Sequence, residues 1–207
     1  KERKESEKER LNSELAFLKN QINPHFFFNT LNNIYSLVQS NLDDGQKAIL
    51  QLSKLMRYLL YETEQELKPL SHEIDFMKNY IELMKLRLSG KVALSISFPD
   101  DFDEVAVPPL LFLPFIENAF KHGISYRKPS FINILMQVDT QQIHFECSNS
   151  IGIKGEELFK PASGIGLDNV KKRLALLFPG RHNLDIKATG ETFSVILNIF
   201  ISPKATQ

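Results

Sequence analysis

The sequence predicts an α+β fold, in which an N-terminal helical hairpin precedes a layer of strands with helices on one face. Two observations lead to this prediction. Apolar residues recur with a helical period as far as about residue 87, and from Val92 onward they alternate with smaller or polar residues. Short polar turns such as 139–141 then favour a sheet whose strands are mostly antiparallel.

The first helical segment has apolar residues spaced alternately four and three apart, at Leu11, Leu15, Leu18 and Ile22. This spacing fits two heptads of a coiled coil, and equally an ordinary amphipathic helix. The helix should continue to Val38 and break at the polar stretch 41–45, where an Asp is available as an N-cap.

A second helix follows, with one apolar stripe made of Ile49, Leu52, Leu55, Met56, Leu59 and Leu60. A single hairpin would leave too much of this stripe exposed. Pairing with a second copy into a dimeric four-helix bundle is therefore predicted, with residues 1–70 as the dimerisation domain.

The remaining domain, residues 71–204, should begin after Pro69 with a helix capped by Ser71 and running to about Arg87. The sequence Val107-Pro108-Pro109 is predicted to open a helix to about His122, and another helix is expected from about 167 to 178. Strands are predicted from Val92 to Phe98 and at 132–138, 142–147 and 193–201.

Composition excludes several classes of protein. The 207 residues contain 25 basic and 25 acidic side chains, so the net charge does not call for nucleic acid or an anionic membrane as partner. The single Cys147 excludes an intrachain disulfide and a cysteine-rich metal site, which fits a reducing compartment. No apolar run approaches the roughly 20 residues of a membrane span. The charged run at residues 1–10 differs from a signal peptide and is typical of a helix entered from upstream.

The most informative segment is residues 20–32, NQINPHFFFNTLN. Pro24 cannot donate to the carbonyl of Asn20, so a kink is expected there that presents His25 in a distorted helical turn. Asn29 lies one turn further on, where it can hydrogen-bond one ring nitrogen and leave the other free as a nucleophile.

This segment resembles the phosphoacceptor motif of the LytS-type sensor histidine kinases. The resemblance implies that His25 receives a phosphoryl group from ATP and passes it to an aspartate in the receiver domain of a response regulator. It also implies a homodimer on the cytoplasmic face of the inner membrane, held there by segments upstream of this chain. A general base is not evident, because Asn29 cannot take a proton at neutral pH; the imidazole proton could go to water or to Glu117.

A second motif, Glu117-Asn118-Ala119-Phe120-Lys121-His122-Gly123, places polar side chains within one turn of each other on a helix. An Asn oxygen suits Mg²⁺ and a Lys suits phosphate oxygens, although a solvated helix end would look similar. The motif resembles the N-box of the GHKL ATPases, whose domain is a Bergerat-type α/β sandwich that binds ATP. The resemblance implies that Asn118 binds the metal, Lys121 binds phosphate and His122 lines the nucleotide pocket.

A third motif is Ser163-Gly164-Ile165-Gly166-Leu167-Asp168-Asn169-Val170. Glycines let the backbone approach a phosphate, and the N–H groups at the start of the following helix can bind it, although a plain turn would look the same. The motif resembles the second glycine box of the GHKL ATPases, which implies nucleotide-binding roles for Gly164, Gly166, Leu167, Asn169 and, further along, Arg173.

One element departs from that pattern. The first glycine box of the GHKL ATPases has an aspartate that accepts a hydrogen bond from the adenine amino group, whereas this chain has Ser148-Asn149-Ser150-Ile151-Gly152. Asn149 or Ser148 could accept the same bond with a neutral oxygen, which is a weaker acceptor. The sequence therefore predicts an ATP- and Mg²⁺-dependent protein histidine kinase of a two-component system. A scaffold that docks a regulator without phosphorylating it, and a conformational ATPase, are the alternatives.

Overall fold

The computed structural model describes residues 24–62, 66–86, 88, 91–125, 128–151 and 165–201. The contacts divide the chain into two compact units, Lys1–Glu64 and Gln65–Gln207, and each is described by itself. The predicted coiled-coil segment and the predicted kink before His25 lie outside the described residues. The predicted domain boundary at residue 70 falls close to this division and stays a prediction.

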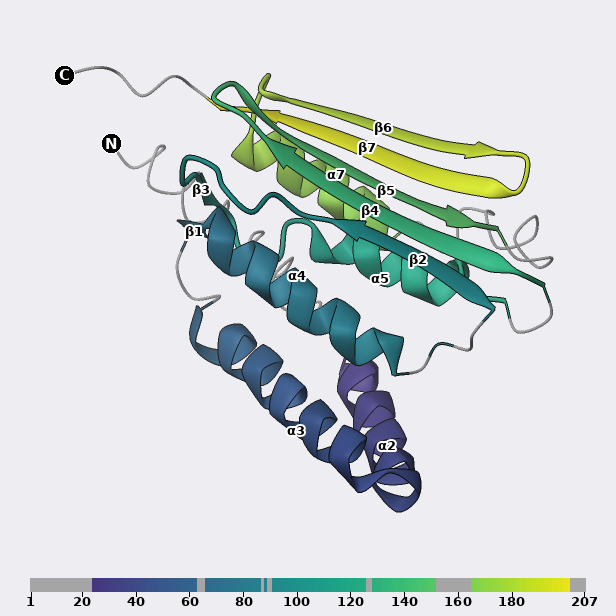
Figure 1. The fold of residues 1–207 in the computed structure, drawn as a ribbon. Helices are drawn as coiled ribbons and strands as arrows, with labels where there is room; N and C mark the ends of the chain where they lie inside the picture. The colour runs from purple at the N-terminus through teal and green to yellow at the C-terminus, as the bar shows by residue number, and fades with distance from the viewer. Residues whose placement is uncertain are drawn as a thin grey trace. The chain divides into compact units, whose positions relative to one another are not determined.

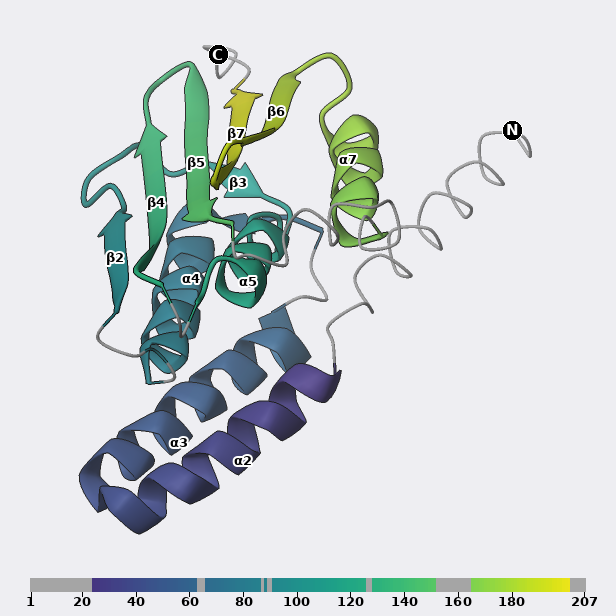
Figure 2. The ribbon, with the colours of Figure 1, turned by 90° about the vertical axis from the view of Figure 1, so that its right-hand side faces the viewer.

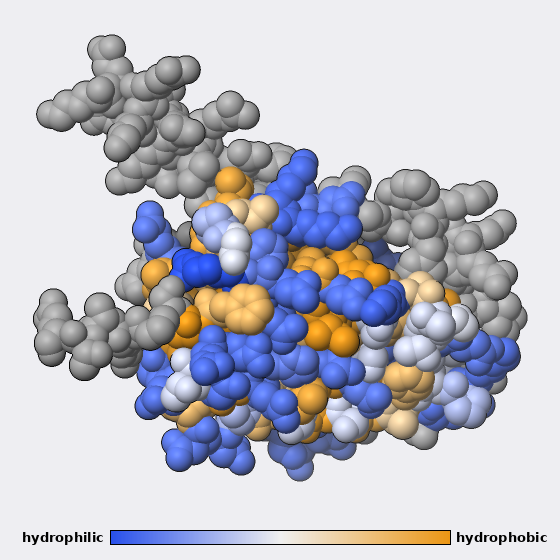
Figure 3. All heavy atoms as spheres, turned by 90° about the horizontal axis from the view of Figure 1, so that it is seen from above, coloured by the Kyte–Doolittle hydropathy of each residue, from blue (hydrophilic) through white to orange (hydrophobic). Residues whose placement is uncertain are grey.

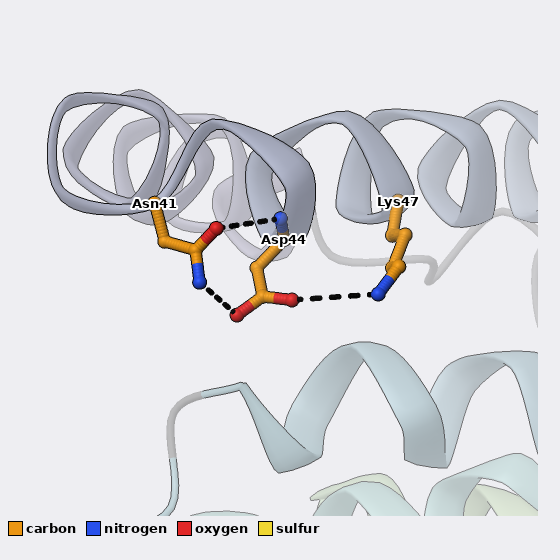
Figure 4. A network of polar contacts seen from close by, with 3 residues as sticks. All are labelled: Asn41, Asp44 and Lys47. Carbon is orange, nitrogen blue, oxygen red and sulfur yellow. Dashed lines mark hydrogen bonds and ion pairs between the residues drawn. The ribbon is translucent and has the colours of Figure 1, made fainter.

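The first unit is a hairpin of two helices, α2 (Pro24–Ser40) and α3 (Leu42–Arg57), and α3 continues into a π-helical turn at Tyr58–Glu62. The turn predicted over residues 41–45 is wrong in extent, because Asn41 alone separates the two helices. Asn41 also supplies the cap that was expected from an Asp. Its Oδ1 accepts from the backbone N–H of Asp44, and its Nδ2 donates to the Asp44 carboxylate at 2.7 Å (Figure 4).

Close packing between the two helices depends on small residues in α3. A Cβ at Gly45 would lie 2.4 Å from Cγ2 of Val38, so a glycine is needed for this approach. Ala48, Leu52 and Leu55 continue the buried face of α3. The predicted single stripe is therefore divided in two, because Ile49, Met56 and Leu60 remain exposed on other parts of the surface.

The second unit is built on a sheet of five strands: β2 (Val92–Ser97), β4 (Ser130–Val138), β5 (Gln142–Ser150), β6 (His182–Thr189) and β7 (Thr192–Phe200). Their order is β2-β4-β5-β7-β6, and every neighbouring pair is antiparallel except β2 with β4. Strand β6 escaped prediction. It lies at an edge of the sheet and none of its residues is buried, and its apolar alternation is limited to Leu184, Ile186 and Ala188 among polar residues.

Three helices cover one face of the sheet: α4 (Leu70–Lys85), α5 (Leu113–His122) and α7 (Ile165–Leu177) (Figures 1 and 2). This confirms a mixed fold of helices and strands. Phenylalanines form the centre of the core between the layers. The ring of Phe145 on β5 lies 5.0 Å from that of Phe112 and 5.9 Å from that of Phe115, measured between centroids.

The opposite face of the sheet carries no helix among the described residues. Alternate residues of β4 and β7 point to this side, and they mix polar groups with half-buried apolar ones such as Leu135 and Ile196. Seen from above, the face is largely hydrophilic with an apolar patch near its middle (Figure 3).

A two-stranded sheet joins the beginning of the second unit to the segment before α5. Strand β1 (Lys68–Pro69) pairs antiparallel with β3 (Ala106–Val107). Pro69 was predicted to end the helical unit, but it belongs to this strand and directly precedes α4. The predicted cap Ser71 instead lies inside the first turn of α4, where its N–H donates to the carboxylate of Glu104 at 3.1 Å.

The helix predicted to open at residues 107–109 begins later, at Leu113. Two consecutive prolines disfavour helical backbone in the residues before them. Leu110 then adopts a φ of 59°, in the left-handed region, which is incompatible with a right-handed α-helix. Residues 108–112 therefore form an irregular, buried connection into α5.

Candidate nucleotide site

Helix α5 separates an apolar face from a polar one. Phe115, Ile116, Ala119 and Phe120 are buried against the core. Glu117, Asn118, Lys121 and His122 occupy the remaining surface, where Lys121 is exposed and the other three are half-buried. The four residues predicted from the N-box motif therefore share one face of one helix, as their spacing requires.

Burial changes the proton affinity of two groups on this face. The pKa of Glu117 is raised because its carboxyl group is desolvated, and the positive charge of Lys121 partly opposes this shift. The pKa of His122 is lowered, first by burial and then by repulsion from Lys121. Glu117 is thus a stronger base than an exposed glutamate, and His122 is a weaker base than an exposed histidine.

The end of α5 rests directly on the end of β5. A Cβ at Gly123 would lie 2.6 Å from Cβ of Asn149, so the glycine leaves room for the Asn149 side chain. Ser150 fixes the same junction, because its Oγ donates to the carbonyl of Gly123 at 2.9 Å and accepts from the N–H of Phe131 at 3.1 Å. The N-box and the residues aligned with the first glycine box are therefore in contact.

The pleat of β5 distinguishes the two residues considered as adenine acceptors. Cys147 faces the helices, since its Sγ lies 3.7 Å from the carbonyl oxygen of Phe115, and Asn149 faces the same side, against Gly123. Ser148 lies between them in the strand, so its side chain points to the opposite face of the sheet. Asn149 is therefore the acceptor on the α5 side. Its Nδ2 donates to the carbonyl of Ser150 at 2.9 Å, which directs Oδ1 elsewhere.

Helix α7 lies beside α5 on the same face of the sheet (Figures 1 and 2). It begins at Ile165, so Gly166 lies in its first turn, followed by the half-buried Leu167 and Asn169. The N–H groups of such a first turn are available to an anion. Gly152 and Gly164, which were also predicted to contact the nucleotide, lie outside the described residues.

Arg173 is deeply buried and contacts the chain's own backbone. Its guanidinium group donates to the carbonyl oxygens of Pro109 and Leu110, just ahead of α5. Glu73 of α4 reaches the same place, where its Oε1 accepts from the N–H of Leu110 at 2.8 Å. The sequence analysis missed Glu73 and Ser150, because neither residue type stands out in its local pattern. Arg173 stays a predicted nucleotide ligand, but its two hydrogen bonds to this backbone do not involve the polar face of α5.

The backbone of His25 lies in the first turn of α2, one helical turn before Asn29. Their side chains lie outside the described residues, so their predicted roles stay predictions. The described residues contain no cluster of three or more His, Cys, Asp or Glu side chains that could enclose a metal ion. The half-buried Asn118 is the residue predicted to offer an oxygen to Mg²⁺, and this stays a prediction.

A hollow of about 570 Å³ lies elsewhere, around the ends of β2, β4 and β5. Its walls include Phe98, Met136, Asp139 and His144. It contains none of the residues predicted to bind ATP, so it is a separate feature from the candidate site.

Two sequence comparisons match this chain to known proteins. Residues 13–92 match the profile of the histidine kinase family. The chain is also 30% identical over 202 residues to the sensor histidine kinase/phosphatase LytS of Staphylococcus aureus strain Mu50, and equally to that of strain N315. Residues 13–92 belong to the histidine kinase family. Both matches confirm the resemblance to LytS-type kinases that the motifs predicted.

The alignment with LytS covers 89% of this chain but 34% of LytS, so the chain spans about a third of the length of these relatives. Among solved structures, the histidine kinase domain of a blue-light activated kinase from Erythrobacter litoralis EL346 has a TM-score of 0.49 and 17% identity over 92% of this chain and 94% of that one. The catalytic domain of the histidine kinase ThkA has a TM-score of 0.45 and 13% identity, over 68% and 99% of the two chains. At these TM-scores the structural likeness adds no argument, and membership rests on the sequence matches. No helix in the described parts of the chain is long and apolar enough to cross a membrane.

Proposed function

We propose that this chain is the kinase region of a two-component sensor, which moves the γ-phosphoryl group of ATP to His25 and then to an aspartate in the receiver domain of a response regulator. The observation behind this proposal is the contact between α5 and the end of β5. It brings Glu117, Asn118 and Lys121 on one helix close to the Asn149 end of β5. A kinase of this kind works on the cytoplasmic side of a membrane, where ATP is available.

The described geometry suggests a division of labour for ATP. Asn149 accepts a hydrogen bond from the base, because its side chain faces α5 and its Oδ1 is not the atom that bonds to Ser150. Asn118 offers an oxygen to Mg²⁺, and Lys121 offers a flexible positive charge to the phosphates. Gly166, Leu167 and Asn169 bring the first-turn N–H groups of α7 to the same phosphates. Gly152 and Gly164 are proposed as further nucleotide contacts. His122 lines the pocket.

Phosphoryl transfer then needs a nucleophile and a destination for one proton. The free ring nitrogen of His25 attacks the γ-phosphorus, the bond to the β-phosphate oxygen breaks, and ADP leaves. Asn29 holds the tautomer that keeps this nitrogen free. Glu117 is the proposed base for the imidazole proton, because burial raises its pKa and so makes it a stronger base. Mg²⁺ would neutralise charge that develops on the phosphate oxygens.

We further propose that the hairpin pairs with a second copy of itself to form a dimeric four-helix bundle. Leu42, Ile49 and Met56 lie on α3 at intervals of one heptad, and all three are exposed. On α2, Phe28, Leu31 and Tyr35 form a comparable exposed row. Burial of both rows in a homodimer would give each hairpin the apolar partner that it lacks.

The neutral oxygen of Asn149 favours one second candidate, a regulator-docking scaffold that has lost its kinase activity. The test is incubation of the full chain with γ-labelled ATP and Mg²⁺, followed by assay for label that is acid-labile and base-stable. His25→Ala should abolish this label, whereas His72→Ala, which alters an exposed histidine on α4, should leave it. Undiminished label on His25→Ala would place the acceptor elsewhere. Regulator binding without any label on the parent protein would support the scaffold.

A further inference from the structure

Leu110 adopts a strained conformation in the interior of the second unit. Its φ of 59° lies in the left-handed region, which a branched side chain rarely occupies, and the residue is buried. Such a conformation persists only when its surroundings hold it in place.

Two side chains from distant parts of the sequence hold this residue. Glu73 accepts the N–H of Leu110, and Arg173 donates to its carbonyl oxygen at 3.3 Å and to that of Pro109. Glu73 is 0% and Arg173 6% exposed. An acidic and a basic group are thus buried at opposite ends of one residue, each hydrogen-bonded to its backbone.

The position of this residue gives the contacts a wider consequence. Glu73 lies on α4 and Arg173 on α7, and Leu110 lies just before α5 begins at Leu113. The three helices that cover the sheet are therefore tied together at one peptide. Any change in the conformation of Leu110 would turn or shift the start of α5, and with it the face that holds Asn118 and Lys121.

We propose that Glu73 and Arg173 are positioning residues for the nucleotide site. They hold Leu110 in its left-handed conformation and so fix the polar face of α5 relative to the first turn of α7. Arg173 acts through the backbone of Leu110 instead of touching a phosphate. This inference rests on the proposed binding of Mg·ATP by α5 and α7.

The test compares Glu73→Gln and Arg173→Lys with two control variants of the full chain. Glu104→Gln alters a carboxylate that also accepts a backbone N–H between the same two segments, but it is exposed and does not touch Leu110. Lys172→Gln removes an exposed positive charge next to Arg173 on α7. Glu73→Gln weakens the hydrogen bond that holds Leu110, and we expect the Kd for Mg·ATP to rise about fivefold in this variant.

Two measurements are made on each variant: the Kd for Mg·ATP, and amide hydrogen exchange followed by peptide across the chain. Glu73→Gln and Arg173→Lys should both weaken binding and speed exchange within residues 105–123, with exchange in β4, β5 and β7 unchanged. The two effects on Kd should be less than additive in the double variant, because both side chains act on one peptide. The controls should match the parent.

A purely structural role would give a different pattern. Faster exchange spread evenly over the second unit, or local loss of protection with an unchanged Kd, would overturn the proposal. Failure of the parent protein to bind Mg·ATP would instead overturn the proposed function. The exchange data would then test only whether Glu73 and Arg173 hold the conformation of Leu110. Faster exchange confined to residues 105–123 supports this, and uniform or absent change overturns it.

Discussion

The hairpin and the sheet-containing unit differ in how far their apolar side chains are buried. In the second unit the large apolar residues are buried or half-buried, and the exposed ones among the described residues are Leu67, Leu86 and Phe200. In the hairpin, exposed apolar side chains lie along both helices: Phe28, Leu31, Tyr35, Leu42, Ile49, Leu50, Met56, Leu60 and Tyr61. The second unit has a complete core, whereas the hairpin has half of one.

This difference parallels the proposed division of chemistry. The complete unit holds the nucleotide site, which needs groups fixed to a rigid scaffold. The incomplete unit holds His25, which in the proposed mechanism meets the γ-phosphate at one step and a response regulator at another. The helix that carries His25 depends on the second hairpin of the proposed dimer to complete its core. Its position can therefore change with that hairpin, while the ATP site stays unchanged.

The largest expected effect follows from placing a charge on the exposed row of α3. Ile49→Asp would put a carboxylate inside the proposed bundle, and an uncompensated buried charge costs about 3–5 kcal/mol, so the dimer dissociation constant should rise roughly 100-fold or more. Sedimentation velocity over a concentration series measures this. Leu86→Asp, on an exposed apolar residue of the other unit, is the matched control and should leave the dimer intact. A parent chain that sediments as a monomer would refute the bundle.

The next effect concerns the base in the complete unit. Glu117→Gln should lower the rate of His25 labelling by roughly 100-fold, within the range of general base catalysis. In the parent the rate should fall as the pH drops through the raised pKa of Glu117, and this limb should be absent from the variant. Because the folded-state pKa is raised, the contribution of Glu117 to stability is fully present below its unfolded pKa. That contribution is lost as the pH rises through the folded pKa. An unchanged rate would assign the proton to water.

The sequence predicted the parts of the fold that depend on local periodicity. Strands β4, β5 and β7 alternate between buried and less buried residues, and helix α7 begins within two residues of its predicted start. It failed where tertiary contacts override local pattern. Residues 108–112 look like a helix start, but Glu73 and Arg173 hold Leu110 in a conformation that no local signal could reveal.

The candidate site shows the same limit. The spacing within the N-box placed Glu117, Asn118, Lys121 and His122 on one face of α5, since a helix has a fixed period. It did not reveal that Ser150 bonds to Gly123, because that contact joins residues far apart in the sequence. The choice between Ser148 and Asn149 needed the pleat of β5 in addition to the alignment.

Two glycines, one in each unit, offer a matched pair of smaller perturbations. An added Cβ would lie 2.4 Å from Cγ2 of Val38 at Gly45, and 2.6 Å from the carbonyl oxygen of Ala119 at Gly123. Each Gly→Ala variant should lose about 1–3 kcal/mol of unfolding free energy in its own unit. Gly45→Ala should weaken the dimer and leave the Kd for ATP unchanged, while Gly123→Ala should do the reverse. Thermal unfolding, sedimentation and nucleotide titration measure the three quantities, and equal effects of both variants on ATP binding would contradict the separation.

The smallest expected effect lies at the base of the nucleotide. Asn149 is 2% exposed and faces α5, whereas Ser148 faces the other side of the sheet, so a carboxylate restores the adenine acceptor at residue 149 alone. A charged acceptor strengthens a hydrogen bond by about 1 kcal/mol, or roughly fivefold in affinity. Asn149→Asp should therefore bind ATP more tightly and raise its preference over GTP, because the 6-oxo group of guanine offers no hydrogen to the new carboxylate. Ser148→Asp, the control on the opposite face, should change neither Kd.

The dissociation constants for ATP and GTP, measured in the parent and in both variants, test this prediction. Sharper selectivity in Ser148→Asp would reverse the assignment of the two faces, and absence of nucleotide binding in all three proteins would favour the scaffold.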